Sequence, residues 1–445
     1  MASAKLTRTF SAGNRKTFTF SAWVKRNGTG TDYEGICIAS GGDEGIFFKD
    51  HGIAFFINGA AQRNTTRVFR DIHAWYHFVL AVDTTQATAA DRVKFYVNGV
   101  QETLYNNSNY PTQNSDGLFN NNAGTHVIAG HSTQSYFLDG EMAHVHYVDG
   151  TAYTPTTFGE TDATTGIWKP KTSPTVTYGT NGFFLKFDNS ANMGLDSAGS
   201  NNLTTSGTII QNKDTPSNVF ATLNLYAFTE DGLSNTVFKN GSTTFDSNET
   251  GSGVYTTSFS TLGVSSGKYY CEYKTTQASG DGVMAIGIGE GDGFESYFGG
   301  GTNSVIYMGD TGQYRKGGSD TSYGNTFTVN DIIGVALDLD NNKLYFSKNG
   351  TWQNSGDPTS GSTGTGAISI SAATATSTGF YFFGIGDKSS GGTCEVSVKF
   401  GNGYFGTTAV SSAQNPDDGN GIFEHDVPAG YRALCTKSIN AEEYS

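Results

Sequence analysis

Proline and charge are both scarce in this chain. Eight prolines among 445 residues are too few for a polyproline stalk or a collagen-like segment, which need proline at short intervals. Charged residues make up 15% of the chain, and 41 acidic against 27 basic residues give a formal net charge of −14. Phosphate backbones are bound by clustered Lys and Arg, so this balance argues against nucleic acid as a partner.

Long apolar runs are missing as well. The opening residues, MASAKLTRTF, hold no apolar signal-peptide core. No stretch approaches the roughly 20 apolar residues of a membrane-spanning helix, so we expect no membrane insertion. No window of about ten residues or more shows helical periodicity. These absences together favour an all-β protein.

Cysteine is scarce as well. The four cysteines lie far apart and form no C-x-x-C pair, so the sequence indicates neither a zinc site nor a disulfide framework. Cys271 and Cys394 lie within alternating apolar segments. Because cysteine is among the most often buried residue types, we expect four buried free thiols, which suit a reducing cytosol.

Glycine and aromatic residues are abundant. The 59 glycines, 23 tyrosines and 31 phenylalanines suit short strands joined by tight turns. The length allows two or three domains. We predict a first domain over residues 1–170, a connector rich in Gly, Asn and Ser with one bridging strand over residues 171–224, and a second domain over residues 225–445.

The first domain is predicted from segments in which apolar and polar residues alternate. They are TFTFSAWVKR (17–26), GIAFFINGA (52–60), AWYHFVLAVD (74–83), DRVKFYVNGV (91–100) and FLDGEMAHVHYVDG (137–150). Asn58-Gly59 and Asn98-Gly99 are strong hairpin signals. The order of these pieces resembles laminin-G-like, or concanavalin-like, jelly rolls. This resemblance implies a β-sandwich without fixing a function, because lectins, adhesion domains and glycosidases share that fold.

The second domain is predicted from a hairpin, DIIGVALDLDNNKLYFSKNGTW (331–352). It resembles the central hairpin of SPRY domains, and SSGKYYCEYKTT (265–276), VMAIGIGE (283–290) and CEVSVKFGNGYF (394–405) resemble other SPRY strands in the right order. Cys271 stands where those domains usually have Trp. The resemblance implies a recognition module. We therefore predict an all-β chain with two β-sandwich or jelly-roll domains in tandem, laminin-G-like and then SPRY-like.

The segment DTPSNVFATLN (214–224) resembles a linker that precedes an SPRY-like domain in virion proteins of tailed bacteriophages. This resemblance implies a virion protein assembled in the host cytoplasm, with other virion proteins as partners. A homo-oligomer is expected of a fibre, although no residue pattern here requires one.

Two patterns raise the question of catalysis. Glu290, Asp292 and Glu295 have the E-x-D-x-x-E spacing of laminarinase-type glycosidases, in which two carboxylates serve as nucleophile and acid. The glycines between them favour a solvated loop over a strand. Residues 263–267 satisfy G-x-S-x-G, but a strand and not a helix is predicted to follow. We therefore predict no enzyme and no catalytic residue.

Metal binding is left open by the sequence. His144 and His146 share one face of a strand, with His126 and His131 nearby in the sequence; they are either a metal pair or the polar outer face of that strand. Calcium is an alternative, because laminin-G-like domains often bind it with loop carboxylates. The aspartates in or beside predicted turns are Asp32, Asp83, Asp139, Asp149 and Asp188. Aspartate is also a common turn residue for local reasons, and we expect no other cofactor.

Ligand-binding candidates are Tyr105, Tyr110 and Tyr136, which lie in polar loops. Sugar recognition combines an exposed aromatic face with hydrogen bonds, although loop tyrosines also serve as covers over a core. We expect a non-enzymatic virion protein, a tail fibre or surface appendage that binds host-surface glycan or protein. The alternatives are a purely structural capsid or tail decoration protein, which binds only neighbouring subunits, and a polysaccharide depolymerase.

Overall fold

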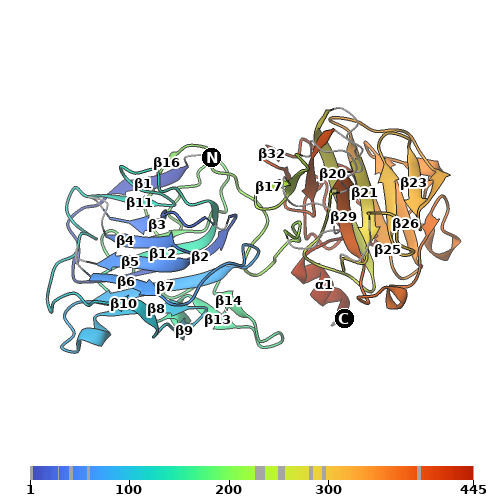
Figure 1. The fold of residues 1–445 in the computed structure, drawn as a ribbon. Coiled ribbons are helices and arrows are strands. Elements are labelled where there is room, and N and C mark those ends of the chain that lie inside the picture. The colour runs from blue at the N-terminus through green and yellow to red at the C-terminus, as the bar shows by residue number, and fades with distance from the viewer. Residues whose placement is uncertain are drawn as a thin grey trace. The chain divides into compact units, whose positions relative to one another are not determined.

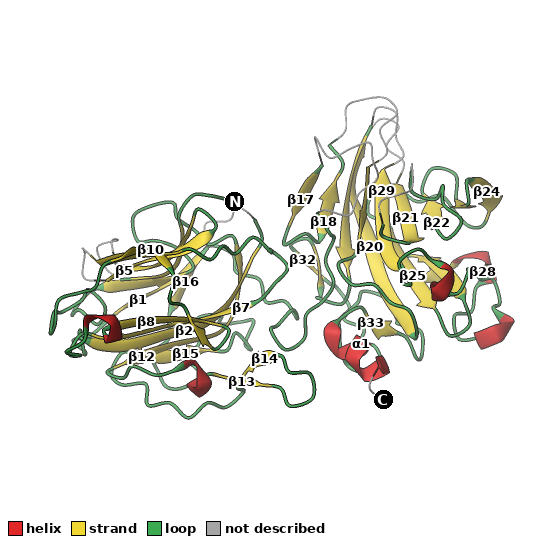
Figure 2. Ribbon diagram, turned by 60° about the horizontal axis from the view of Figure 1, so that its bottom comes forward, coloured by secondary structure: helices red, strands yellow, loops and turns green. Residues whose placement is uncertain are grey.

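The chain folds into two compact units, residues 1–211 and 212–445. The computed structural model describes residues 4–443 except residues 29, 40–43, 58–60, 226–235, 249–255, 280–283, 293–296 and 388–391. Both units are built from β-sheets, as Figures 1 and 2 show, and the α-helix of the described residues is α1 (Thr436–Glu443). The predicted all-β class with two sandwiches in tandem is confirmed. The boundary between the units lies inside the segment 171–224, which the sequence identifies as a connector.

The first unit is a sandwich of two antiparallel sheets. The larger sheet has the order β10-β6-β5-β4-β3-β11-β1-β16. Its strands are β1 (Lys5–Thr9), β3 (Glu34–Ile38), β4 (Gly45–Lys49), β5 (Gly52–Ile57), β6 (Ala61–Thr65), β10 (Tyr105–Ser108), β11 (Thr125–Ile128) and β16 (Thr204–Ser206). The smaller sheet has the order β15-β12-β2-β7-β8-β9. Its strands are β2 (Thr17–Arg26), β7 (Tyr76–Asp83), β8 (Val93–Val97), β9 (Val100–Gln101), β12 (Gly140–Asp149) and β15 (Phe183–Leu185).

Alternation along each strand decides which side chains enter the core of this unit. Phe18 and Phe20 of β2 face the larger sheet, as do Phe78 and Leu80 of β7, and all four are fully buried. Asn98 and Gly99 adopt φ values of 49° and 83° and form the predicted turn between β8 and β9. The predicted turn at residues 58–59 lies outside the described residues.

Residues beyond 170 complete both sheets of the first unit. Strand β15 pairs with β12, and β16 pairs with β1. Phe183, Leu185 and Leu203 are buried in the same core as the earlier strands. A separate hairpin of β13 (Gly159–Thr161) and β14 (Trp168–Pro170) precedes them. Residues 171–211 therefore contribute to the packing of this sandwich.

The second unit is another sandwich. One sheet follows the order β17-β18-β30-β20-β25-β26-β27, with β28 beside β26 and β33 beside β20. Its strands are β17 (Val237–Lys239), β18 (Thr244–Asp246), β20 (Lys268–Ser279), β25 (Ile332–Asp338), β26 (Lys343–Lys348), β27 (Thr351–Trp352), β28 (Ile368–Ser369), β30 (Thr393–Lys399) and β33 (Arg432–Ala433). The other sheet follows the order β19-β29-β21-β22-β23-β24. Its strands are β19 (Thr256–Phe259), β21 (Met284–Gly289), β22 (Val305–Met308), β23 (Gln313–Lys316), β24 (Ser319–Ser322) and β29 (Phe382–Asp387). A short hairpin of β31 (Tyr404–Phe405) and β32 (Thr408–Ala409) follows β30.

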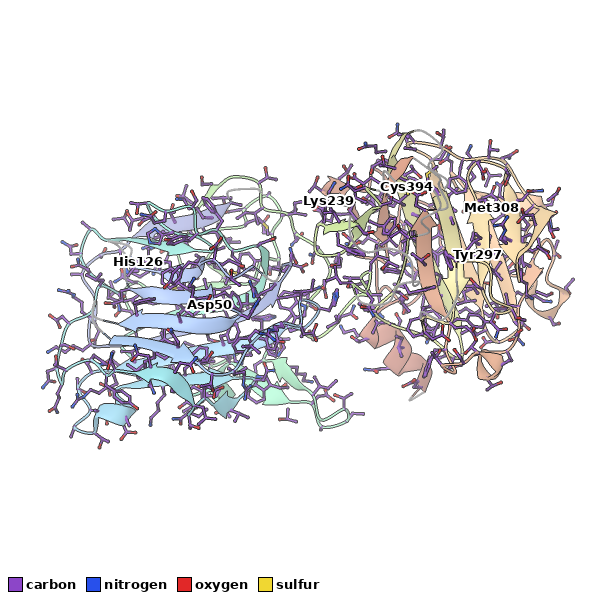
Figure 3. The ribbon with its side chains drawn as sticks, viewed as in Figure 1. Asp50, His126, Lys239, Tyr297, Met308 and Cys394 are labelled. Atoms are coloured by element: carbon purple, nitrogen blue, oxygen red, sulfur yellow. The ribbon has the colours of Figure 1, made fainter. Side chains whose placement is uncertain are left out.

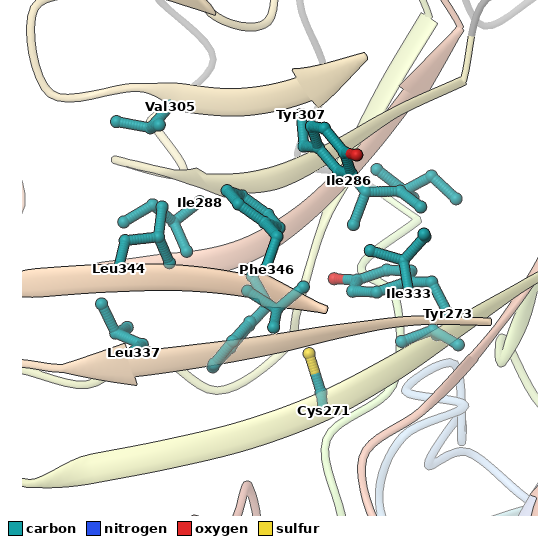
Figure 4. Close-up of a cluster of buried hydrophobic side chains, with 14 of the residues drawn as sticks. Cys271, Tyr273, Ile286, Ile288, Val305, Tyr307, Ile333, Leu337, Leu344 and Phe346 are labelled. Atoms are coloured by element: carbon teal, nitrogen blue, oxygen red, sulfur yellow. The ribbon is translucent and has the colours of Figure 1, made fainter. Parts of the chain in front are cut away.

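The hairpin read from the sequence is β25–β26. Leu337 lies opposite Leu344, and Val335 lies opposite Phe346. Figure 4 shows Leu337, Leu344 and Phe346 in the core together with Cys271 of β20. Cys271 therefore fills a core position beside β25. All four cysteines are buried and free, as predicted.

The two ends of the second unit are joined by main-chain hydrogen bonds. The N–H of Ala221 donates to the carbonyl of Leu434 at 3.0 Å, and the N–H of Thr436 donates to the carbonyl of Val219 at 2.9 Å. An apolar layer on the outer face of the sheet that contains β20, β25 and β26 includes Tyr270 and Tyr345 from the strands and Phe423 and Tyr431 from the C-terminal segment. This segment is thus part of the sandwich and not a tail.

Candidate ligand-binding surface

An aromatic patch covers part of the outer face of the larger sheet in the first unit. Ile36, Phe48 and Phe55 point into the core, so their neighbours Phe47 and Phe56 point outward, where they pack on buried Ile38 and Val127. Tyr33 and Tyr136, from loops, lie over the same strands. We call this set the outer aromatic patch; its rings are Tyr33, Phe47, Phe56, His131 and Tyr136.

The rings of the outer aromatic patch are in mutual contact. The centroid of Tyr33 lies 5.4 Å from that of Tyr136 and 6.5 Å from that of Phe56. Phe47 lies beneath, 3% exposed, whereas Tyr33, Phe56 and Tyr136 are only half-buried. The sheet therefore presents three neighbouring, partly exposed rings to solvent, backed by the buried side chains of Ile38, Phe47 and Val127.

Local hydrogen bonds fix the loop that carries Tyr136. The ring nitrogen Nδ1 of His131 accepts the backbone N–H groups of Thr133 and Gln134, at 3.1 and 3.0 Å. The carbonyl of Tyr136 accepts the N–H of Gly35 at 2.9 Å. A side chain at Gly35 would place its Cβ 2.4 Å from the carbonyl of Gly130, so glycine allows this close approach. Tyr136 is thus held against β3 at both its carbonyl and its preceding turn.

Charged groups lie beside the outer aromatic patch, next to Tyr33. Lys49 Nζ lies 4.8 Å from the Tyr33 ring centroid and 3.6 Å from an Asp50 carboxylate oxygen. Asp50, labelled in Figure 3, is in the β4–β5 turn, with a side chain 71% exposed. Asp50 and His51 both have positive φ, 51° and 65°, which costs energy for non-glycine residues and aims this turn beside the patch. Aromatic faces bordered by charged groups suit sugar or peptide recognition.

The other two candidate tyrosines lie elsewhere. The guanidinium of Arg63 is sandwiched between the rings of Tyr105 and Tyr110, 3.8 and 4.4 Å from their centroids. Arg63 also donates to the carbonyl of Val93 in the smaller sheet at 3.2 Å, and the Tyr105 hydroxyl donates to the carbonyl of Glu102 at 2.8 Å. The structure brings Tyr105 and Tyr110 together at the edge of the sandwich and places Tyr136 apart from them, in the outer aromatic patch.

The four histidines considered as metal ligands do not form one site. His126 is inside the sandwich, with its ring stacked on Phe10 at 3.6 Å. His131 lies in the outer aromatic patch. His144 lies within an irregularity in the pairing of β12 with β2, between Ala143 and His146. His146 is 1% exposed beneath residues 150–178, where its Nδ1 and the Tyr178 hydroxyl are 2.8 Å apart. Val145 and Tyr147 face the core, so His144 and His146 lie on the outer face of β12, but a further layer of chain covers that face.

The same covered face buries His77. Its Nδ1 accepts the indole N–H of Trp168 at 3.0 Å, so its proton is on Nε2, which lies 2.8 Å from the hydroxyl of Ser21. Burial lowers the pKa of His77 to about 3 and that of His144 to about 4. These imidazoles are therefore neutral structural groups at ordinary pH.

Carboxylates from the sequence patterns serve local structure. Glu290 Oε1 accepts from the Asn303 amide at 3.0 Å and from the Ser377 N–H at 2.7 Å, and Asp292 accepts from the Ser377 hydroxyl. The third residue of that pattern, Glu295, lies outside the described residues. Residues 263–267 are followed by strand β20.

Among the candidate calcium ligands, Asp149 accepts the N–H groups of Asn14 and Asn181, and Asp83 accepts from Thr85 and Gln86. No group of three or more His, Cys, Asp or Glu side chains within the described ranges is arranged to hold a metal ion. In the part of the chain that the structure describes, no helix has the length and apolar character needed to cross a bilayer.

Comparisons with known proteins agree with both folds. A family model of the concanavalin A-like lectin/glucanases superfamily matches residues 2–156, and a model of the SPRY domain matches residues 268–368. The chain therefore holds a laminin-G-like domain of concanavalin fold followed by a SPRY domain.

Sequence relatives match a short part of the chain. Ran-binding protein 9 from Danio rerio and its Homo sapiens counterpart are each 37% identical to it over 86 residues, which is 19% of this chain. The match spans 14% of the Danio rerio protein and 12% of the human one.

Solved structures show similarity at low identity. The SPRY domain of human HERC1 is 16% identical, with 40% of this chain and 96% of that chain covered and a TM-score of 0.31. A Bacteroides ovatus protein put forward as a carbohydrate binding protein is 17% identical, with 46% of this chain and 56% of that chain covered and a TM-score of 0.34.

Of the outer aromatic patch, only His131 and Tyr136 are candidates in the sequence. Its signal was present in two Phe-Phe pairs, 47–48 and 55–56, on neighbouring strands. Because successive strand residues face opposite sides, each pair puts one ring into the core and one on the outer face. Tyr33 carries no such signal, since only the fold brings its loop over these strands.

Proposed function

We propose that this chain is a non-enzymatic virion protein whose first domain binds a glycan or protein on a host surface through the outer aromatic patch. The partly exposed rings of Tyr33, Phe56 and Tyr136, grouped over one sheet, carry the proposal, because clustered aromatic surface that solvent reaches marks binding sites. The resemblance of residues 214–224 to a phage linker supports the virion assignment, and so do two recognition folds in tandem. A tail fibre or surface appendage is the expected place on the particle.

The decisive test is binding of the full chain to a panel of bacterial cells and to polysaccharide extracted from them. Saturable binding is expected, and Tyr136→Ala and Tyr33→Ala are each expected to weaken it roughly tenfold or more, as for central aromatic contacts. Leu104→Ala is a matched control, since Leu104 is 65% exposed and lies outside the patch. Equal binding by all variants would move the site away from the patch.

Two additions to the same experiment separate the alternatives. Loss of binding in EDTA would add calcium to the site. New reducing ends from the polysaccharide would indicate a depolymerase and direct attention to Glu290 and Asp292. Absence of any binding, with the chain retained by purified particles of its own virus, would favour a decoration protein that contacts only neighbouring subunits.

A further inference from the structure

A fully buried pair of opposite charge lies on the outer face of β20 and β30 in the second domain, beneath the C-terminal segment. Lys399 of β30 stands directly opposite Glu272 of β20, and its Nζ lies 2.8 Å from a carboxylate oxygen, Oε2. Neither side chain has exposed surface. The Phe405 ring centroid is 3.9 Å from Nζ and shields the amine from water. Buried charges of this kind either find several hydrogen-bond partners or become neutral.

The two members of this pair are unequally satisfied. Within the described ranges the only polar partner of Nζ is the Glu272 carboxylate, although an ammonium carries three N–H donors. The carboxyl group, in contrast, accepts from the Tyr270 hydroxyl at 3.1 Å and from the backbone N–H groups of His425 and Glu424 at 2.8 and 2.9 Å. Burial also lowers the pKa of Lys399, which favours the neutral amine.

We propose that Lys399 and Glu272 condense into an intramolecular amide that crosslinks β30 to β20. Transfer of one proton from Nζ to Oε2 gives an amine beside a carboxylic acid. The Nζ lone pair attacks Cδ, the Cδ–Oε2 bond breaks, and Oε2 leaves as water with the carboxyl proton and a second proton from Nζ. No oxidant, reductant or further reactant is consumed.

The groups that surround the carboxyl suit this reaction. The Tyr270 hydroxyl and the N–H of His425 both point at Oε1, where negative charge develops when the amine adds to Cδ. The cross-strand register already holds the two reacting groups together. The reaction therefore costs little further conformational entropy, as in other intramolecular reactions. Exclusion of water by Phe405 opposes the reverse reaction, hydrolysis of the amide.

Intact mass spectrometry of the purified full chain tests the proposal. The crosslinked chain is expected to weigh about 18 Da less than its sequence, the mass of one water molecule. Tryptic digestion of the same sample is expected to give a branched peptide in which YYCEYK (269–274) is joined to the segment containing Lys399, with no cleavage after Lys399. The full sequence mass, together with free cleavage after Lys399, would overturn the proposal.

Two variants distinguish the proposed amide from loss of water at another site in the chain, for example at an Asp-Gly step. In Lys399→Met the deficit is expected to disappear. In Lys268→Met it is expected to stay, because Lys268 belongs to a different pair of the same sheet, 3.3 Å from Asp338. A deficit that survives in Lys399→Met would overturn the assignment. Should that variant not fold, the branched peptide of the natural chain still decides the question.

Discussion

At the scale of single residues, the buried Arg63 at the edge of the first sandwich is held by aromatic rings as well as by hydrogen bonds. Arg63 is 5% exposed, and its guanidinium lies between Tyr105 and Tyr110. Planar guanidinium groups stack well on aromatic faces, and their long stems also bury apolar surface. Two of the three tyrosines that the sequence offers as ligand contacts are thereby engaged with the protein itself.

Replacement of Arg63 is expected to destabilise the first domain. Arg63→Ala removes both stacking contacts and the hydrogen bond to Val93, so the free energy of unfolding of the first domain should fall by about 2–4 kcal/mol. Arg70→Ala, at an exposed position, should change it by less than about 0.5 kcal/mol. Urea unfolding of both variants measures the difference, and equal midpoints would contradict the role given to Arg63.

Acid sensitivity is a second residue-scale expectation. Burial lowers the pKa of His126 to about 4 from an ordinary value of 6.5, so the folded state disfavours its charged form. The stabilisation is complete above pH 6.5 and is lost as the pH falls from there toward 4. One such histidine contributes a slope of up to about 1.4 kcal/mol per pH unit.

His126→Phe keeps the stacking on Phe10 and removes the titration. We expect a shallower dependence of unfolding free energy on pH between 4 and 6.5, whatever the change in stability at neutral pH. Unfolding midpoints at a series of pH values give this slope. An unchanged slope would mean that His126 does not take up a proton on unfolding.

At the scale of elements, a layer of chain forms a roof over the outer face of the smaller sheet in the first unit. Strand β14 brings the Trp168 indole to His77, and Phe158 packs on Val79 and Val148. The layer turns a face that would otherwise meet solvent into a second, smaller core. Outward strand positions there hold Trp23 and His77, whose rings stack with centroids 4.9 Å apart, and His77 has a hydrogen-bond partner at each ring nitrogen.

The close packing of this roof gives an element-scale prediction. A Cβ added at Gly159 would lie 2.5 Å from Trp168 Cζ2, so Gly159→Ala should displace the indole and weaken its bond to His77. We expect a loss of about 1–3 kcal/mol. Gly30→Ala is the control, since its nearest atom would be 3.7 Å away. Trp fluorescence during urea unfolding reports both; a neutral Gly159→Ala would show that the roof is loosely packed.

At the scale of the whole molecule, the chain is two compact units divided at residues 211 and 212. Strands β15 and β16 come late in the first unit, yet they complete its two sheets at their edges. Phe183, Leu185 and Leu203 add buried apolar surface to its core. Domain boundaries drawn by composition alone place these residues in a connector.

Truncation distinguishes the two boundaries. We expect residues 1–211 and residues 212–445 each to fold alone, with cooperative unfolding. Residues 1–170, which lack β15 and β16, should be unfolded or strongly destabilised, because two sheet edges and three core side chains are lost. Circular dichroism and protease resistance compare these fragments; a stable 1–170 fragment would show that the later strands are dispensable.

Much of the fold follows from residue order. Alternation with period two in β2, β7 and β25 identifies strands and the side chains that face inward, and Asn98-Gly99 marks a hairpin because it readily adopts positive φ. Tyr136 lies in the outer aromatic patch, although loop composition could not separate it from Tyr105 and Tyr110. The difference is what packs on each ring, and that depends on residues distant in the sequence.

What the sequence by itself determined is the all-β class, the two resemblances and the two faces of each strand. Only the tertiary structure decided whether the outward face of each sheet is exposed to solvent or covered by other chain. That face is partly exposed beside Tyr136 and is covered above His77 and above Lys399 and Glu272. The physical reason is that local periodicity records which side of a strand a residue occupies. Whether another segment covers that side depends on long-range packing, which brings residue 399 beside residue 272.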